Sequence, residues 1–174
     1  MKKVFLFAGT VIALLLAVSY LTSAINYFIL MEFANNSSDV ISYAILYLIF
    51  AIAIFAAGGI AFAITLKSFK KETSLLAPAI LLAVCAAIVL FGHQTVYGVM
   101  VVKSVKSYQE QINNPMYVFD EQIINLYKAQ IKATVISYAI SFVEGLTLTA
   151  LAVLSFINFD KKKEANPQIE EAEY

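Results

Sequence analysis

Four long apolar stretches dominate the chain and restrict the folds that are open to it. They run over about residues 4–29, 40–66, 75–102 and 133–159. Each is longer than the ~20 residues that an α-helix needs to cross a hydrocarbon core ~30 Å thick. The stretches are continuous rather than alternating, and a helix satisfies its backbone polar groups within one segment, so helices are favoured over a β-barrel. The sequence predicts an all-α, four-span transmembrane helical bundle embedded in a lipid bilayer.

The composition excludes several other classes of protein. Hydrophobic residues make up 61% of the chain and charged residues only 14%, which is far from the average of soluble domains. Twelve basic and twelve acidic residues balance, so no global field attracts nucleic acid. The single Cys85 lies within the third span, which excludes intramolecular disulfides and cysteine metal clusters. We expect no metal, no cofactor and no nucleic-acid partner.

The lysines predict the topology. They gather before the first span, between the second and third spans and after the fourth, at Lys2, Lys3, Lys67, Lys70, Lys71 and Lys161–Lys163. Four crossings place these three clusters on one side, as the positive-inside rule requires. The first span is expected to be retained, because its apolar run continues to Leu30, beyond the length of a signal peptide. We therefore expect both termini in the cytoplasm and the protein in the plasma (inner) membrane.

A repeat suggests that the bundle is a duplicated two-helix hairpin. The hexapeptide Val-Ile-Ser-Tyr-Ala-Ile occupies residues 40–45 and again residues 135–140, at the start of the second and fourth spans. Spans one and three share a weaker echo, at residues 13–18 and 79–84. Two spans per unit keep the orientation, so the repeats would be parallel. The alternative is coincidence between apolar segments.

The connection between spans three and four, about residues 103–132, is the longest in the chain. Apolar residues at helical spacing predict that span three continues as a helix and that a second helix leads into span four. Residues 113–115 (Asn-Asn-Pro) favour a turn between them. We expect a helical hairpin that protrudes from the outer face of the membrane. Residues 160–174 are polar and acidic, which predicts a disordered cytoplasmic tail.

Glu144 is the residue that most needs an explanation. It lies near the middle of span four, where an ionisable group is costly and usually faces a bundle interior or a cavity. Counting ~1.5 Å per residue, His93 lies roughly 7 Å and Glu144 roughly 2 Å outward of their span centres, so a pair between them is geometrically allowed. We predict an outward-facing polar pocket for a ligand or ion, lined by Glu144, His93, Gln94, Ser137, Ser141, Ser19, Asn26 and Tyr97.

Small residues recur at four-residue spacing in the cytoplasmic half of the spans. Such residues allow helices to approach closely, and van der Waals contact then drives their association. The predicted helix-packing positions are Gly9, Ala13, Ala17, Ala57, Gly59, Ala61, Ala79, Ala83 and Ala87. The sequence thus predicts a tightly packed cytoplasmic half and a looser, more polar outer half.

The polar residues have structural interpretations of equal weight. Glu144 can be a neutral acid that is hydrogen-bonded within the bundle, and the serines can join helices through hydrogen bonds. One histidine and one glutamate are too few for a convincing metal site. The tyrosines near the span ends fit the aromatic belt of the membrane interface.

These sequence features leave three classes of function open. The first is a non-enzymatic accessory or scaffolding subunit of a membrane protein assembly, with other subunits or further copies of the chain as partners. The second is an ion, proton or small-ligand binding or transport component that uses Glu144 and His93. A duplicated hairpin with one carboxylate in the fourth span resembles, in layout only, the proteolipid ring subunits of rotary ATPases. The chain departs from that family in having six glycines and a long outer connection, so we do not assign it there. An enzyme is the least favoured class, because no catalytic or phosphate-binding motif occurs.

Overall fold

The computed structural model describes residues 1–33, 38–71, 74–113 and 121–157, and every regular element within these ranges is helical. The first two spans are α1 (Lys2–Phe33) and α2 (Ser38–Lys70). The third is a continuous rod made of α3 (Leu76–Ala87), a π-helical segment η1 (Ile88–His93) and α4 (Gln94–Ile112). The fourth is α5 (Glu121–Phe156). All four rods are long and apolar enough to cross a membrane.

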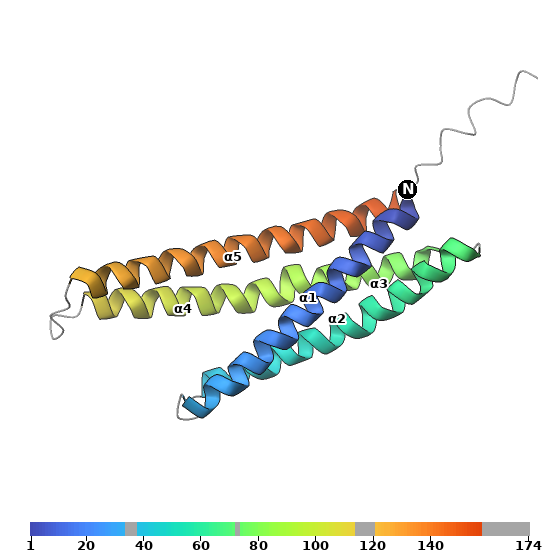
Figure 1. Cartoon of the computed structure of the whole chain (residues 1–174). Coiled ribbons are helices and arrows are strands. Elements are labelled where there is room, and N and C mark those ends of the chain that lie inside the picture. The colour runs from blue at the N-terminus through green and yellow to red at the C-terminus, as the bar shows by residue number, and fades with distance from the viewer. Residues whose placement is uncertain (34–37, 72–73, 114–120, 158–174) are drawn as a thin grey trace, which may run out of the picture.

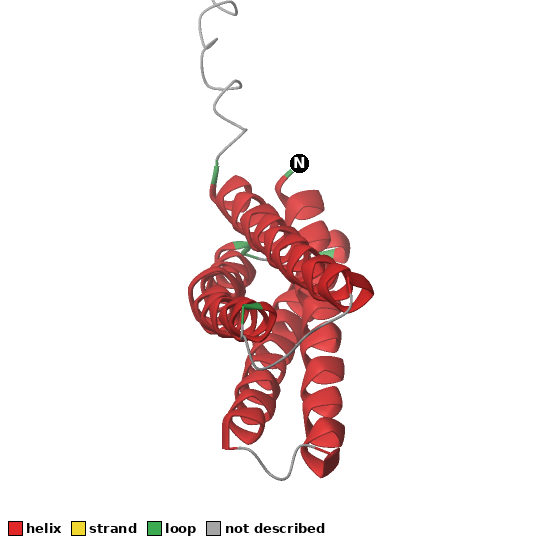
Figure 2. Cartoon of the chain, turned by 90° about the vertical axis from the view of Figure 1, so that its left-hand side faces the viewer, coloured by secondary structure: helices red, strands yellow, loops and turns green. Residues whose placement is uncertain are grey.

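The four rods form two antiparallel hairpins that cross each other, α1 with α2 and the third rod with α5 (Figure 1). The N-terminus, the α2–α3 connection and the end of α5 lie at one end of the molecule. The hairpins pack together toward that end and diverge toward the other, where the α4–α5 arm reaches furthest (Figures 1 and 2). The core therefore lies where the hairpins cross, and it contains small and medium-sized apolar residues of all four rods.

Large apolar side chains cover the outside of the bundle. Ile52, Phe91, Val102 and Val143 are all more than half exposed, although each belongs to a helix of the bundle. A water-soluble protein rarely leaves contiguous apolar surface of this extent uncovered, whereas a membrane-spanning bundle faces lipid with it. Helix length and this surface together are those of a multi-pass helical membrane protein.

The helices are longer than the apolar stretches that predicted them. The third rod runs ten residues past the expected end at residue 102, to Ile112, and α5 begins at Glu121 rather than near residue 133. The rings of Tyr108 and Tyr127 lie 5.8 Å apart, so these two extensions pack against each other. The predicted continuation of helix beyond the apolar spans is therefore present. Of the expected turn at residues 113–115, residues 114 and 115 lie outside the described residues, and so does the whole of the expected tail at residues 160–174.

Local chemistry explains where α3 begins. Pro78 stands at the third residue of the helix, where its missing amide does no harm because the first four amides of a helix lack intrahelical partners. The Ser74 hydroxyl accepts a hydrogen bond from the Leu76 amide just before the first turn, with the two atoms 3.4 Å apart. Helix α3 can therefore begin at Leu76, a short distance along the chain from the end of α2 at Lys70.

The lysine-rich ends of the first hairpin meet in the structure. The Lys3 ammonium donates a hydrogen bond to the backbone carbonyl of Ser68, and Lys67 and Lys70 occupy the last turn of α2. A helix C-terminus carries partial negative charge, so lysines there are stabilising. The first two lysine clusters therefore lie at the same end of the bundle, and the third, at residues 161–163, lies outside the described residues.

Close helix packing depends on only part of the small-residue set. A Cβ added to Gly9 would lie 2.6 Å from Cδ2 of Leu82, so α1 and α3 interlock there. Of the predicted positions, Gly9, Ala13, Ala17, Ala61 and Ala79 are buried, and Ala57 and Ala83 are half-buried against the core. Ala87 is exposed, and a Cβ on Gly59 would meet nothing within 4 Å. Gly58, not Gly59, faces the neighbouring helices, with Ala13 and Cys85 within 4 Å of an added Cβ.

We expect Gly9→Ala to destabilise the bundle by about 1–3 kcal/mol, because the fully buried Leu82 must move to make room. Gly59→Ala is the matched control and should be neutral or stabilise by up to about 1 kcal/mol, since it adds a methyl group to open space. Unfolding in mixed micelles with increasing sodium dodecyl sulfate measures both. Equal effects of the two substitutions would contradict the interlocking of Gly9 with Leu82.

Candidate functional site

The π-helical segment η1 interrupts the third rod at the point where the hairpins cross. Single π-turns inside α-helices are uncommon and occur often at functional sites. An added Cβ on Gly92 would lie 3.1 Å from the Phe50 ring of α2, and one on Gly145 of α5 would lie 3.4 Å from Val89. The segment is therefore held tightly between α2 and α5. It ends at His93, whose side chain is buried.

Aromatic rings from three helices surround His93. The Tyr20 ring of α1 stacks on the imidazole, with centroids 4.4 Å apart and planes at 27°. Tyr47 and Phe50 of α2 meet it edge-on, with centroid distances of 5.4 and 6.3 Å. Tyr97, one turn further along α4, lies 5.4 Å away. His93 is thus the centre of a packed aromatic cluster, which we call the His93 cluster and define as His93, Tyr20, Tyr47, Phe50 and Tyr97.

Hydrogen bonds extend this cluster across three helices. The Tyr47 hydroxyl lies 3.3 Å from Nε2 of His93, and the Ser141 hydroxyl of α5 lies 3.5 Å from Nδ1. The Gln94 amide donates to Ser141 over 2.9 Å. One assignment of protons satisfies all three contacts: Gln94 donates to Ser141, Ser141 donates to Nδ1, and the Nε2 proton goes to the Tyr47 oxygen. The result is a polar chain that joins α2, the third rod and α5.

One polar atom in this chain lacks a partner. The Gln94 side chain is buried, and its Oε1 has no hydrogen-bond partner among the described residues. Buried polar atoms are nearly always satisfied by protein or by ordered water. The position beside Ser141 therefore has unused capacity to accept one hydrogen bond.

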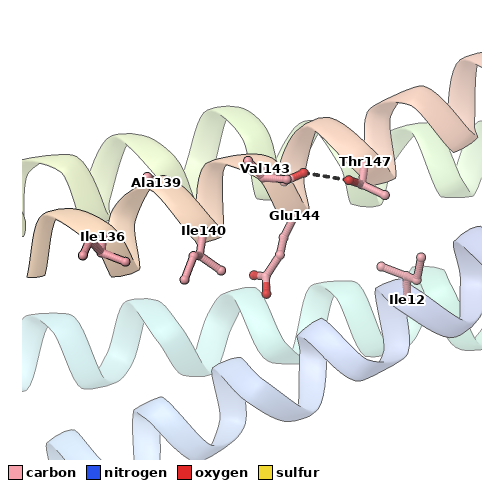
Figure 3. Close-up of a pocket in the computed structure, with 7 residues that line it drawn as sticks. All are labelled: Ile12, Ile136, Ala139, Ile140, Val143, Glu144 and Thr147. Carbon is pink, nitrogen blue, oxygen red and sulfur yellow. Dashed lines mark hydrogen bonds between the residues drawn. The ribbon is translucent and has the colours of Figure 1, made fainter. Parts of the chain in front are cut away.

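Glu144 lies outside this chain, in a groove between α1 and α5. The groove has a volume of about 490 Å³, and Figure 3 shows the Glu144 carboxylate pointing away from α5 into it. Its other polar residue is Thr147, whose hydroxyl donates to the Val143 carbonyl over 2.8 Å. The remaining lining is apolar, namely Ile12, Ile136, Ala139, Ile140 and Val143. An exposed carboxylate at mid-span is thus surrounded by hydrocarbon.

His93 and Glu144 do not form a direct pair, although they lie at similar depth. Both imidazole nitrogens face hydroxyl groups, and His93 does not line the groove that contains Glu144. Tyr20 stacks on His93 from α1, the helix that also contributes Ile12 to the groove of Glu144. The predicted single polar pocket is therefore divided into a buried cluster and an apolar groove.

The other predicted pocket residues are divided between the His93 cluster and its edge, on one side, and the exposed surface of α1, on the other. Ser137 and Tyr97 are hydrogen-bonded to each other, and the Tyr97 ring also packs against Tyr138 at 5.7 Å. Ser19 and Asn26 have exposed side chains on α1 that do not join the cluster. In the described part of the chain, no group of three or more histidine, cysteine, aspartate or glutamate residues could hold a metal ion.

Sequence reasoning missed the aromatic partners of His93. Tyr20, Tyr47 and Phe50 are not among the expected site residues. The available signal was weak: Tyr43, Tyr47 and Phe50 stand at spacings of four and three, which places them on one helix face. Nothing in that spacing indicates that the face meets a histidine on another span.

The fold and the site define a four-span helical membrane protein with a buried histidine cluster and a mid-span carboxylate. The chain matches no protein-family model, and comparison with curated proteins and with solved structures likewise finds no match. The residues of this chain are therefore the source of any functional assignment.

Proposed function

We propose that this protein is a non-enzymatic accessory or scaffolding subunit of a membrane protein assembly, and that a transmembrane helix of a partner subunit occupies the Glu144 groove. The observation that carries this proposal is the exposed Glu144 carboxylate in an otherwise apolar groove. A polar or charged group in hydrocarbon is costly whether it is ionised or neutral, so such residues face a partner or an aqueous cavity. A partner helix that covers the groove removes this cost.

The chemistry of Glu144 defines the partner. An ionised carboxylate at this depth requires a basic or strongly hydrogen-bond-donating side chain opposite it. All twelve basic residues of this chain are lysines near span ends or in connections, so a second copy offers no cation at mid-span. Two copies would instead bring like charges together. The partner is therefore a different protein with a donor near the middle of a span.

The rest of the groove suits a helix. Ala139 and the β-branched Ile136, Ile140 and Val143 provide a ridged apolar wall without bulky rings. Helices in membranes associate through van der Waals packing and interhelical hydrogen bonds. The groove offers both, with the Glu144 carboxylate as the group that selects the partner's register, since the Thr147 hydroxyl already donates to the Val143 carbonyl.

Native mass spectrometry of the gently extracted protein tests this proposal, and we expect the wild type to carry a partner protein in defined stoichiometry. Glu144→Leu should lower partner retention about tenfold or more, because the partner's donor is left unpaired. Glu110→Gln is the control, since this exposed acid on α4 lies outside the groove and pairs with Lys106. A wild-type chain that emerges alone, or only with copies of itself, would refute the subunit proposal.

A second candidate is ion, proton or small-ligand handling, and the hydrogen-bonded chain from Tyr47 through His93 to Ser141 and Gln94 favours it. Such chains can pass protons, and buried intramembrane histidines and acids occur in relays. The same mass spectra discriminate the two functions. A lone chain that retains a small ligand or ion, which His93→Phe loses, would support this candidate instead.

We extend the proposal to topology and origin. Both termini lie in the cytoplasm, and the membrane is the plasma (inner) membrane. The end of α4 and the start of α5 protrude from the outer face of that membrane. The lysines at the α1–α2 ends support this orientation.

The shared hexapeptide supports a duplicated hairpin. Tyr43 and Tyr138 occupy the same position in its two copies, and each packs against a tyrosine of the preceding rod, Tyr27 and Tyr97 respectively.

A further inference from the structure

A second pocket lies where the two hairpins diverge. Its volume is about 370 Å³, and it is formed by Tyr27 and Tyr43 of the first hairpin together with one face of α4. The α4 residues are Met100, Lys103, Ser104, Ser107 and Tyr108, which follow one another at helical spacing, and Val40 completes the lining from α2. This size is within the range of small-molecule sites, and the pocket is separate from the Glu144 groove.

The polarity of the pocket changes along its length. At its inner end the Tyr27 hydroxyl is used within the protein, because it donates to the Met100 sulfur over 4.0 Å. Lys103 and Ser104 come about 5 Å further outward along the helix, and Ser107 about 10 Å. The Lys103 ammonium and the two serine hydroxyls therefore stand toward the outer end of the pocket, whereas Met100 and the Tyr27 ring form its more apolar inner end. A ligand that fits has an anionic head and an apolar body.

The depth of the pocket matches the membrane surface. Lys103 lies about 22 Å along the rod from the centre of the third apolar stretch, and half of a hydrocarbon core is about 15 Å thick. Tyr27 and Tyr43 lie about 15–16 Å from the centres of their own stretches, so the tyrosines and Lys103 span the level of the lipid headgroups, where tyrosine is enriched, and Ser107 lies about 6 Å further out than Lys103. Phospholipids supply an anionic phosphodiester at this level and acyl chains below it.

We propose that the pocket between Tyr27, Tyr43 and α4 binds one glycerophospholipid from the outer leaflet. Lys103, Ser104 and Ser107 hold the phosphodiester through charge-assisted and hydroxyl hydrogen bonds, and the upper acyl chain lies along Met100. Lys103 also has a partner within the chain, and the three donors of an ammonium allow both contacts. The lipid fills the wedge between the diverging hairpins and sets their separation.

Lipid titration of the detergent-purified protein, followed by native mass spectrometry, tests the site with palmitoyl-oleoyl-phosphatidylglycerol as the probe. The wild type should retain one lipid, and Lys103→Gln should bind it about tenfold more weakly or worse. Lys106→Gln is the matched control, because Lys106 is one turn away, exposed and paired with Glu110 at 3.8 Å. Equal weakening by both substitutions would overturn the proposal.

Three further experiments test what the pocket recognises. Ser107→Trp, which fills the pocket and keeps the lysine, should also abolish retention while the lipid-free protein unfolds at the wild-type detergent concentration. Diacylglycerol, which lacks the phosphate, should not bind. Excess inorganic phosphate should not displace the lipid. Tight binding of diacylglycerol would overturn phosphate recognition, and displacement by inorganic phosphate would identify a site for the free anion and overturn the lipid assignment.

Discussion

Replacing His93 by alanine should lower the free energy of unfolding by about 3–5 kcal/mol, the range for removing a large buried ring. The imidazole is buried among Tyr20, Tyr47, Phe50 and Tyr97, and its loss leaves a cavity where α1, α2 and the third rod meet. It also leaves the Tyr47 and Ser141 hydroxyls without the partners that they have in the cluster. Unfolding in mixed micelles with sodium dodecyl sulfate measures the loss.

Two companion substitutions separate packing from hydrogen bonding. His93→Phe keeps a ring in the cluster but removes both nitrogens, so we expect a smaller loss of about 1–3 kcal/mol. Thr95→Ala is the control on the same helix, because the Thr95 side chain is exposed and its hydroxyl bonds only to the Phe91 carbonyl. Its effect should stay within about 0.5 kcal/mol. A His93→Ala protein as stable as Thr95→Ala would contradict the cluster.

The second large effect is expected from Leu82→Ala, which should cost about 2 kcal/mol or more. Leu82 is fully buried, and its methyl groups fill the space that Gly9 leaves on α1. Lipid is as apolar as leucine, so this loss comes from dispersion contacts across a cavity rather than from transfer out of water. The same micelle unfolding assay measures it.

Ile80→Ala is the matched control for Leu82→Ala. Ile80 lies half a turn away on α3 and is 48% exposed, so lipid can fill the space left by its truncation. We expect a loss below about 1 kcal/mol there. In the double variant Gly9→Ala with Leu82→Ala, the added methyl group enters the vacated space, so the combined loss should be smaller than the sum of the single losses. Strict additivity would show that the two residues do not interlock.

The polar residues of α5 lie on two faces of the helix. Ser137, Ser141 and Glu144, which the sequence analysis assigned to one pocket, have spacings of four and three, and such spacings place residues on one side of a helix. The face that packs in the structure is instead Ser141, Gly145, Leu148, Ala152 and Ser155. A step of three residues falls about 60° short of a full turn, so Ser141 can enter the core while Glu144 points into the groove beside it. Spacing alone does not tell which of two adjacent faces meets the next helix.

The π-helical segment shows a second limit of sequence reasoning. Residues 88–93 contain no proline and have the same apolar character as their neighbours, so nothing in them predicts a change of helical pitch. The extra residue in the turn is accommodated because Gly92 and Gly145 allow Phe50 and Val89 to approach closely. Those contacts join residues that are about forty to sixty positions apart, and no local pattern encodes them.

The sequence by itself determined the number of helices, their approximate extent, the continuation of helix beyond spans three and four, and the presence of a mid-span carboxylate. Each of these follows from local hydrogen bonding and from the cost of polar groups in hydrocarbon, which depend on neighbouring residues alone. Only the tertiary structure decided that aromatic side chains of α1, α2 and α4 surround His93, that Glu144 faces an apolar groove, and that the hairpins diverge. These features depend on how side chains of different helices interdigitate. Lipid is as apolar as the helices themselves, so hydrophobicity does not select among such arrangements in a membrane.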